Sequence, residues 1–272
     1  MNTCILRKTG RSYDTCKGIL QNMEMNNVTC VQTCDGSRNA DILIRWGCTA
    51  CHNGQFEINT SEMIHLASDK IAARRKMIEK GIPCPRTFFS KAEALAFNRY
   101  PIIGRQRQHS QGRRITISRS ANDIMNDRRS AYWSEFIPKD REFRVYTFFG
   151  RILAVSEKIP NNPRKIAWNK SLGNGVFKNL KVSELPRSVG LLALKAVHAL
   201  NVDFSAVDCI SKDGQAYVLE FNNSPELSPY RQLLFARAFN WAIRRIEQIG
   251  EKPKHFEVPQ NEQGKMILLC RN

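Results

Sequence analysis

Two carboxylates and a carboxamide lie close together in the C-terminal half of the chain. Asp208 stands in VDCI, and Glu220 and Asn222 stand in LEFNN. Both segments alternate like β-strands, and the dipeptide Asp213-Gly214 between them is typical of a hairpin turn. We expect Asp208 opposite Glu220 and Asn222, whose side chains share one strand face. Hard oxygen ligands of this kind suit Mg²⁺ bound to phosphates, whereas a polar face on an exposed hairpin is the alternative.

The cysteines suggest other metal chemistry. The chain has nine, and Cys48, Cys51 and His52 form a C-x-x-C-H run that is typical of haem attachment in exported proteins. Together, Cys30, Cys34, Cys48 and Cys51 could also supply four thiolates to zinc. The odd count and the lack of an export signal favour free thiols, and the zinc alternative stays open.

Composition and charge limit the class of protein. Of 272 residues, 42% are hydrophobic and 25% charged, which is typical of a globular chain. The net charge of +17 predicts anionic partners, such as polyphosphate nucleotides, nucleic acid or acidic peptides. No apolar run is long enough to span a membrane, and the first one, Cys4 to Leu6, is too short for a secretion signal. We therefore expect a cytoplasmic protein without membrane partners.

The elements that would position these side chains can be read from hydrophobic periodicity. Short apolar strands at 4–6, 28–31 and 42–46 alternate with helical segments and predict a small α/β unit. Ser68 or Asp69 would cap a helix that runs to Lys80 and stops at Gly81. Prolines 83 and 85 then enforce an extended linker.

The rest of the chain is mostly strand, so the predicted fold class is α+β. The expected strands are 100–107, 114–118, 132–137, a hairpin on either side of Gly150 and Arg151, 204–210 and 216–221, with helices at 121–130, 185–200 and 233–249. The last twenty residues have little pattern and are expected to form a tail or one short strand.

Four segments, in this order, resemble the ATP-grasp superfamily, and within it the RimK-like glutamate ligases and glutathione synthetases more than the biotin carboxylases. They are SDKIAARRKMIEKGIPCPRT, YPIIGRQRQHSQGRRI, YWSEFIP followed by EFRV, and VDCI through LEFNNSP. The resemblance implies two α+β lobes that clamp ATP, preceded by a small α/β pre-ATP-grasp domain. The implied divisions are 1–66 for the N-terminal domain, 67–138 for the linker helix and small lobe, 139–250 for the C-terminal lobe and 251–272 for the tail.

The resemblance also implies roles for individual residues around ATP. Lys70 and Arg105 would contact the phosphates, and the loop 109–114, which contains Gly112, would close over them. On the nucleoside, Glu135 would accept from the adenine amino group, the backbone of Phe136 and Ile137 would bind the ring edge, and Glu142 would bind the ribose.

Three residues are implied on the substrate side. Arg144 follows Glu142 on the same strand face and would bind the transferring phosphoryl group, while Lys158 and Asn169 would line the substrate pocket. The chain departs from the family at Arg105, where lysine is usual, and at Glu226, where glycine is common. These departures bear on substrate choice more than on nucleotide binding.

The predicted function is that of an ATP-dependent ligase which joins a carboxylate to an amine through an acyl phosphate, with one or two Mg²⁺ ions. The predicted substrates are an amino acid and a peptide or protein terminus. The alternatives are a basic nucleic-acid-binding protein with an inactive nucleotide fold, and a kinase that stops at phosphoryl transfer.

Overall fold

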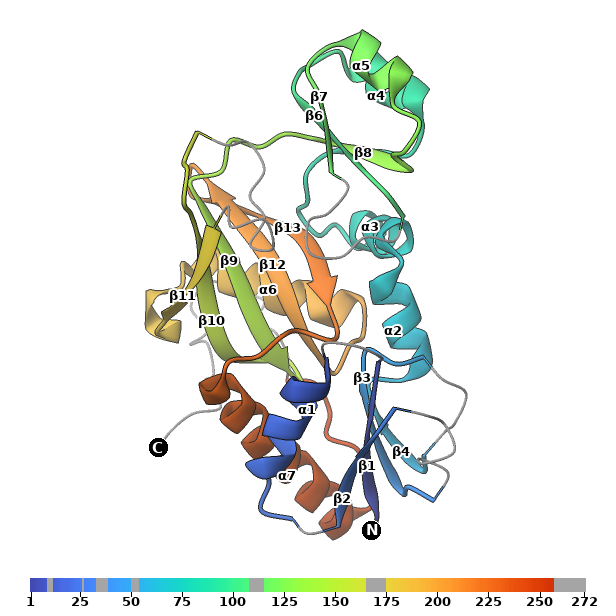
Figure 1. The fold of residues 1–272 in the computed structure, drawn as a ribbon, viewed down its shortest axis with the longest axis vertical. Coiled ribbons are helices and arrows are strands. Elements are labelled where there is room, and N and C mark those ends of the chain that lie inside the picture. Colours follow the sequence, from blue (N-terminus) through green and yellow to red (C-terminus); the bar gives the residue numbers. More distant parts are fainter. Residues whose placement is uncertain are drawn as a thin grey trace.

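The computed structural model describes residues 1–8, 12–25, 27–32, 39–49, 54–107, 115–164 and 175–256. Strands in these ranges form three sheets, of four, five and four strands. Figure 1 shows the N-terminal sheet at one end of an elongated molecule, the five-stranded sheet in the middle and the third sheet at the far end. No helix within the described ranges is long and apolar enough to cross a bilayer.

The N-terminal sheet is parallel, in the order β2-β1-β3-β4. Its strands are β1 (Thr3–Arg7), β2 (Val28–Val31), β3 (Ile42–Trp46) and β4 (Phe56–Ile58), and helix α1 (Ser12–Gln21) connects β1 to β2. Apolar side chains alternate between the two faces, with Ile5 and Ile44 on one and Cys4 and Leu43 on the other. The predicted small α/β unit is confirmed.

Two short helices lead out of this unit. Thr60 caps α2 (Ser61–Ser68), and Asp69 caps α3 (Lys70–Glu79) by accepting from the backbone N–H groups of residues 71 and 72. Arg74 is buried in α3 and donates to the carbonyls of residues 218 and 219. The capped helix predicted after Asp69 is therefore present, and it is tied to the central sheet.

A small lobe follows, with a sheet in the order β5-β8-β6-β7. Its elements are β5 (Thr87–Phe88), α4 (Lys91–Phe97), β6 (Ile102–Arg105), β7 (Thr116–Ser118), α5 (Ala121–Asn126) and β8 (Tyr132–Glu135). A separate apolar cluster of Phe88, Ala94, Ile102, Ile124 and Trp133 holds its helices against the sheet. Strands β6 and β8 are shorter than predicted, and β8 ends before Pro138, which cannot donate to a ladder.

The central sheet is antiparallel, in the order β11-β10-β9-β12-β13. Its elements are β9 (Arg141–Phe148), β10 (Arg151–Pro160), β11 (Gly175–Leu180), a 3₁₀ turn at Val182–Glu184, α6 (Arg187–Ala199), β12 (Phe204–Lys212) and β13 (Gln215–Asn222). Helix α6 covers one face, where Val145, Val207 and Val218 lie in a continuous apolar core. The other face is apolar only at one end.

Helix α7 (Pro229–Ile249) covers that apolar end and also packs against the N-terminal unit. Phe239 of α7 contacts the rings of Trp46, Phe148 and Phe204, which belong to the N-terminal sheet and the central sheet. The predicted ranges 1–66 and 139–250 therefore share one core. The division of the chain into domains stays a prediction.

Helix α7 starts earlier than predicted, at Pro229, because proline is well suited to the first turn of a helix. Past the helix, Phe256 donates its backbone N–H to the carbonyl of Phe149. Residues 257–272, which include most of the predicted tail, lie outside the described ranges.

Candidate active site

The register of the central sheet aligns five polar side chains in one row. Ser156 of β10 stands opposite Asn179 of β11 and Arg144 of β9, and Asp208 of β12 stands opposite Arg144 and Glu220 of β13. Directly opposite residues in antiparallel strands point to the same side. We call these five residues the polar row. Their face is opposite to the one that α6 covers.

Asn222 lies beside the polar row rather than within it. It stands opposite Ala206, while Asp208 faces Glu220. The prediction that both residues face Asp208 is thus correct for Glu220 and wrong for Asn222, because each residue of an antiparallel strand has one direct partner. Asn222 still shares the face of Glu220, and its Oδ1 accepts from the backbone N–H of Ser224 at 3.0 Å.

Arg144 and Asp208 form the central ion pair of the row. The Nε of Arg144 donates to Oδ1 of Asp208 at 2.6 Å, and Nη2 donates to Oδ2 at 2.7 Å. Burial raises the pKa of the Asp208 carboxyl, and the charge and hydrogen bonds of Arg144 oppose that rise. Burial alone would lower the pKa of Arg144, but the attraction of Asp208 raises it above its usual value. The predicted metal ligand and the predicted phosphoryl-binding residue are therefore partners in this structure.

Glu142 lies on the same face, two residues from Arg144, as predicted. It is buried and accepts from the ammonium groups of Lys139 and, at 3.2 Å, Lys158. Burial opposes ionisation, but the two lysines hold the pKa of Glu142 below its usual range. Sequence reasoning missed Lys139. Lys139 precedes Glu142 by three residues, a spacing that brings side chains together in a helix. Because the segment between them is not helical, the spacing alone does not predict the contact.

The predicted phosphate-binding cations lie close to the row. Lys70, the first residue of α3, donates from Nζ to the carbonyl of Phe221 at 2.6 Å. Burial lowers its pKa, whereas the charges of Glu220 and Asp208 raise it and that of Arg105 lowers it. These four charged groups are therefore near neighbours. The Nε of Arg105 is buried and has no hydrogen-bond partner among the residues that the structure describes.

The residues expected around the nucleoside lie on the connection from the small lobe to the central sheet. Glu135 ends β8, and its Oε1 accepts from the backbone N–H of Arg86 at 2.8 Å. Phe136 and Ile137 follow, and the carbonyl of Ile137 accepts from the N–H of Lys139. Gly112, its loop 109–114 and Asn169 lie outside the described residues.

The donor set at the row fits a hard divalent cation. Asp208, Glu220 and Asn222 offer two carboxylates and a carboxamide oxygen on one face, which are the ligands that Mg²⁺ prefers. Among the described residues, no three His, Cys, Asp or Glu side chains form a metal-binding group, so the carboxamide would have to be the third ligand. Because both oxygens of Asp208 accept from Arg144, a cation there would share or displace that pair.

Of the four cysteines that suggested zinc, the structure describes Cys30 and Cys48, which lie on different sides of the N-terminal sheet. Cys30 packs against the cluster on one side of the N-terminal sheet, and Cys48 packs against the cluster on the other side. Cys34 and Cys51 lie outside the described residues. The placement of Cys30 and Cys48 gives no support to a shared zinc site.

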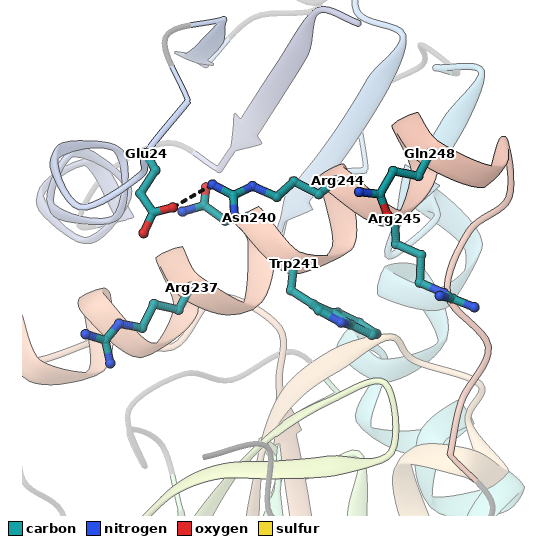
Figure 2. Close-up of a pocket in the computed structure, with 7 residues that line it drawn as sticks. All are labelled: Glu24, Arg237, Asn240, Trp241, Arg244, Arg245 and Gln248. Carbon is teal, nitrogen blue, oxygen red and sulfur yellow. Dashed lines mark hydrogen bonds and ion pairs between the residues drawn. The ribbon is translucent and has the colours of Figure 1, made fainter. Parts of the chain in front are cut away.

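A separate hollow of about 340 Å³ lies along α7, away from the polar row. Figure 2 shows its lining, which is Glu24, Arg237, Asn240, Trp241, Arg244, Arg245 and Gln248. Glu24 is the one carboxylate in that lining, and it accepts from Arg244 at 2.6 Å. The hollow offers a single carboxylate, whereas the row and Asn222 offer two carboxylates and a carboxamide on one face, so the row is the better candidate for a metal nucleotide.

No family model matches the chain. The chain is 23% identical over 190 residues to the coenzyme gamma-F420-2:alpha-L-glutamate ligase of Methanococcus maripaludis. The aligned residues cover 66% of this chain and 67% of that relative.

Two solved structures share the fold. The D-alanine–D-alanine ligase from Bacillus anthracis complexed with ATP has a TM-score of 0.66 at 15% identity, over 90% of this chain and 98% of that one. A RimK domain ATP-grasp protein from Sphaerobacter thermophilus has a TM-score of 0.61 at 12% identity, over 88% of this chain and 99% of that one. The α+β fold class and the resemblance to ATP-grasp ligases that the sequence led us to expect are confirmed.

Proposed function

We propose that this protein is an ATP-dependent ligase that joins a carboxylate to an amine as an amide or peptide bond. The observation that carries the proposal is the polar row, where Arg144, Asp208 and Glu220 lie side by side across three strands. A row that holds one guanidinium and two carboxylates, with Lys70 beside it, suits a nucleotide triphosphate and its metal. That the relatives are ligases favours this function over a nucleic-acid-binding protein or a kinase.

The cations beside the row would bind the phosphates. Lys70 is fixed by its bond to the carbonyl of Phe221, and Arg105 has a buried Nε without a partner in the described part of the chain. Two cations held on rigid elements neutralise polyphosphate charge without reorganising during the reaction. Asp208, Glu220 and Asn222 would hold Mg²⁺, which supplies charge stabilisation at the phosphate oxygens when bound.

Arg144 would exchange partners during the reaction. In this structure its fork donates to Asp208, and the same two donors match two oxygens of a phosphoryl group. A substrate carboxylate attacks the γ-phosphate of ATP, ADP leaves, and Arg144 neutralises the charge on the transferring group. An amine then attacks the acyl phosphate, phosphate leaves and the amide nitrogen loses a proton.

The neighbouring residues would place the nucleoside and the substrates. The Glu142 carboxylate would accept hydrogen bonds from the ribose hydroxyls. Glu135 and the backbone of Phe136 and Ile137 would contact the adenine ring. Lys158, whose ammonium reaches Glu142, would line the substrate side together with Asn169. The relative from Methanococcus maripaludis is a glutamate ligase, so we propose an acidic amino acid as one substrate and a peptide or protein terminus as the other.

The test is ADP release across a panel of carboxylates and amines, with mass spectrometry of the product. We expect ADP only when both substrates are present. Asp208→Asn and Glu220→Gln should each lower that rate about 100-fold or more. Asp213→Asn is the matched control, because Asp213 lies at the exposed tip of the same hairpin. Unchanged turnover in both D208N and E220Q would refute the site.

A further inference from the structure

The hollow along α7 carries positive charge that its own residues do not balance. Arg237, Arg244 and Arg245 line it, and the carboxylate of Glu24 pairs with Arg244 at 2.6 Å. Within the described ranges, Arg237 and Arg245 have no ion-pair partner. Two exposed guanidinium groups on one side of a helix are therefore available to an anion from outside the chain.

A buried amide in the same lining also lacks partners. Asn240 has 4% of its surface exposed, and neither its Nδ2 nor its Oδ1 forms a hydrogen bond within the part of the chain that the structure describes. Asn240 precedes Arg244 by four residues, so the two side chains are neighbours on the helix, and Figure 2 shows the amide beside the Glu24–Arg244 pair. Because buried polar groups are normally hydrogen-bonded, this amide indicates a ligand that offers both an acceptor and a donor.

The Glu24–Arg244 pair is a cover that can open easily. The side chains of Glu24 and Arg244 are 64% and 56% exposed. Exposed ion pairs contribute little to stability because water screens them, whereas an unpaired buried amide has lost its hydrogen bonds to water outright. Opening of the pair would uncover the Asn240 amide and free a third guanidinium group for the ligand.

An aromatic ring completes the lining. Trp241 is half-buried, and its ring packs against Phe148 and Phe149 at the β9–β10 turn, with ring centroids 6.4 Å apart in both cases. The guanidinium of Arg151 lies over the same ring at 6.0 Å, and its Nε is buried with no partner among the residues described. The indole ring is therefore held in a fixed place between a basic turn and a basic helix face.

These groups together favour one class of anion. A carboxylate or inorganic phosphate would use the arginines but leave the Trp241 ring and the Asn240 amide without contacts. A nucleotide would use all of them, because arginine suits its phosphate, an indole suits the face of its base, and an amide matches the adjacent donor and acceptor on a base edge. The volume of about 340 Å³ is in the range of pockets for small ligands. Since the lining holds a single carboxylate, no Mg²⁺ need accompany the nucleotide.

We propose that the hollow along α7 is a second nucleotide site, which takes a nucleotide unit without a metal ion. The three arginines bind its phosphate, and Trp241 and Asn240 contact its base. The unit is a free nucleotide or one residue of a single nucleic-acid strand, because both present the same phosphate, sugar and base. The net charge of +17 attracts either one. The site shares no residue with the polar row, so it is independent of the ligase function proposed above.

The first test measures binding of AMP, adenosine and inorganic phosphate to the full chain by titration calorimetry in EDTA. We expect AMP to bind about tenfold more tightly than adenosine or phosphate, because only AMP uses both the ring and the arginines. Arg237→Gln and Arg245→Gln should each weaken AMP binding about tenfold, which corresponds to one exposed charge-assisted hydrogen bond. Arg128→Gln is the matched control, because Arg128 is an exposed arginine of the small lobe, and it should bind like the wild type.

Asn240→Leu separates a binding role from a structural one. Leucine is close to asparagine in size and removes an unpaired amide, so N240L should melt no lower than the wild type in the absence of ligand. It should nevertheless bind AMP about tenfold more weakly and bind inorganic phosphate as before. Equal AMP affinity in the wild type, R237Q, R245Q and N240L would overturn the proposal. So would AMP binding that is lost in Lys70→Gln alone, since the AMP would then occupy the polar row.

The second test distinguishes the two sources of the nucleotide. A labelled strand of six deoxyadenosine nucleotides is titrated at several salt concentrations. If the strand occupies the hollow, the slope of log affinity against log salt should be smaller by about 0.7 in R237Q and R245Q and unchanged in R128Q. Such binding supports a nucleic-acid strand as the source, and AMP binding without strand binding supports a free nucleotide. Binding of neither AMP nor the strand would overturn the proposal, as would an equal loss of slope in R128Q.

Discussion

Arg144 donates both arms of its guanidinium fork to Asp208 across the β9–β12 ladder, at 2.6 and 2.7 Å. The pair joins two residues with opposite proposed roles, one for the phosphoryl group and one for the metal. Its geometry keeps both side chains ordered on the sheet face before any ligand binds. Binding of the metal nucleotide would therefore replace an existing pair rather than order free side chains.

Loss of this pair should destabilise the protein. Arg144→Met leaves the buried Asp208 carboxylate without its partner, so we expect the free energy of unfolding to fall by about 3 kcal/mol. The double variant R144M/D208N removes the unpaired charge and should be more stable than R144M alone. Urea unfolding of the three proteins measures both differences. A double variant less stable than R144M would show that Arg144 does not act through Asp208.

Glu142 should discriminate between ribose and deoxyribose. If its carboxylate accepts from ribose hydroxyls, wild-type protein should prefer ATP to 2′-deoxy-ATP about tenfold, and Glu142→Gln should lose most of that preference. Competition for ATP binding measures the ratio. Glu157→Gln is the control, because Glu157 pairs with Arg141 and lies next to Ser156 on the alternate strand face. An unchanged preference in E142Q would exclude the ribose role.

Asp127 should add a pH-dependent contribution to stability. Burial would raise its pKa, but hydrogen bonds from Ser130, Thr116 and the backbone of Arg129 lower it to about 2. A carboxyl with a lowered folded-state pKa stabilises the protein above about pH 4 and loses that effect as the pH falls to 2.

Asp127→Asn should therefore lower the free energy of unfolding at pH 7 by about 1 kcal/mol, since solvent screens this partly exposed group. The stability difference between wild type and D127N should shrink between pH 4 and 2. Unfolding curves over that range measure it. A difference that stays constant with pH would contradict the assigned pKa.

Phe239 should couple the N-terminal unit to the central sheet. Because it is fully buried and contacts Trp46 and Phe204, Phe239→Ala should cost about 3–5 kcal/mol. Calorimetry should show one transition for these two regions in the wild type, shifted as a whole in F239A. Separate melting of the N-terminal unit in the wild type would contradict the shared core.

Local patterns in the sequence predicted much of this architecture. The β12–β13 hairpin follows from alternating residues around Asp213 and Gly214, which adopt positive φ angles of 48° and 78°. The N-terminal cap of α3 was likewise predicted from a single residue, Asp69. These features depend on neighbours in the chain, so short-range rules suffice for them.

Contacts between distant segments could not be predicted in the same way. Arg144 and Asp208 are 64 positions apart, and their pairing depends on how β9 lies against β12. Arg231 lies outside the predicted helix 233–249, and only the packing of α7 brings it to Ser156. Lys139 contacts Glu142 through the conformation of a linker that has no periodic pattern.

Helix α7 carries Arg231 at its start and Phe239 further along, where the helix rests on Trp46. Removing residues 1–58 would expose the aromatic side of α7 to water and leave the helix that carries Arg231 supported on one side only. The N-terminal unit therefore supports the lobe that carries the candidate active site, and replacing it with an unrelated unit should disturb that site.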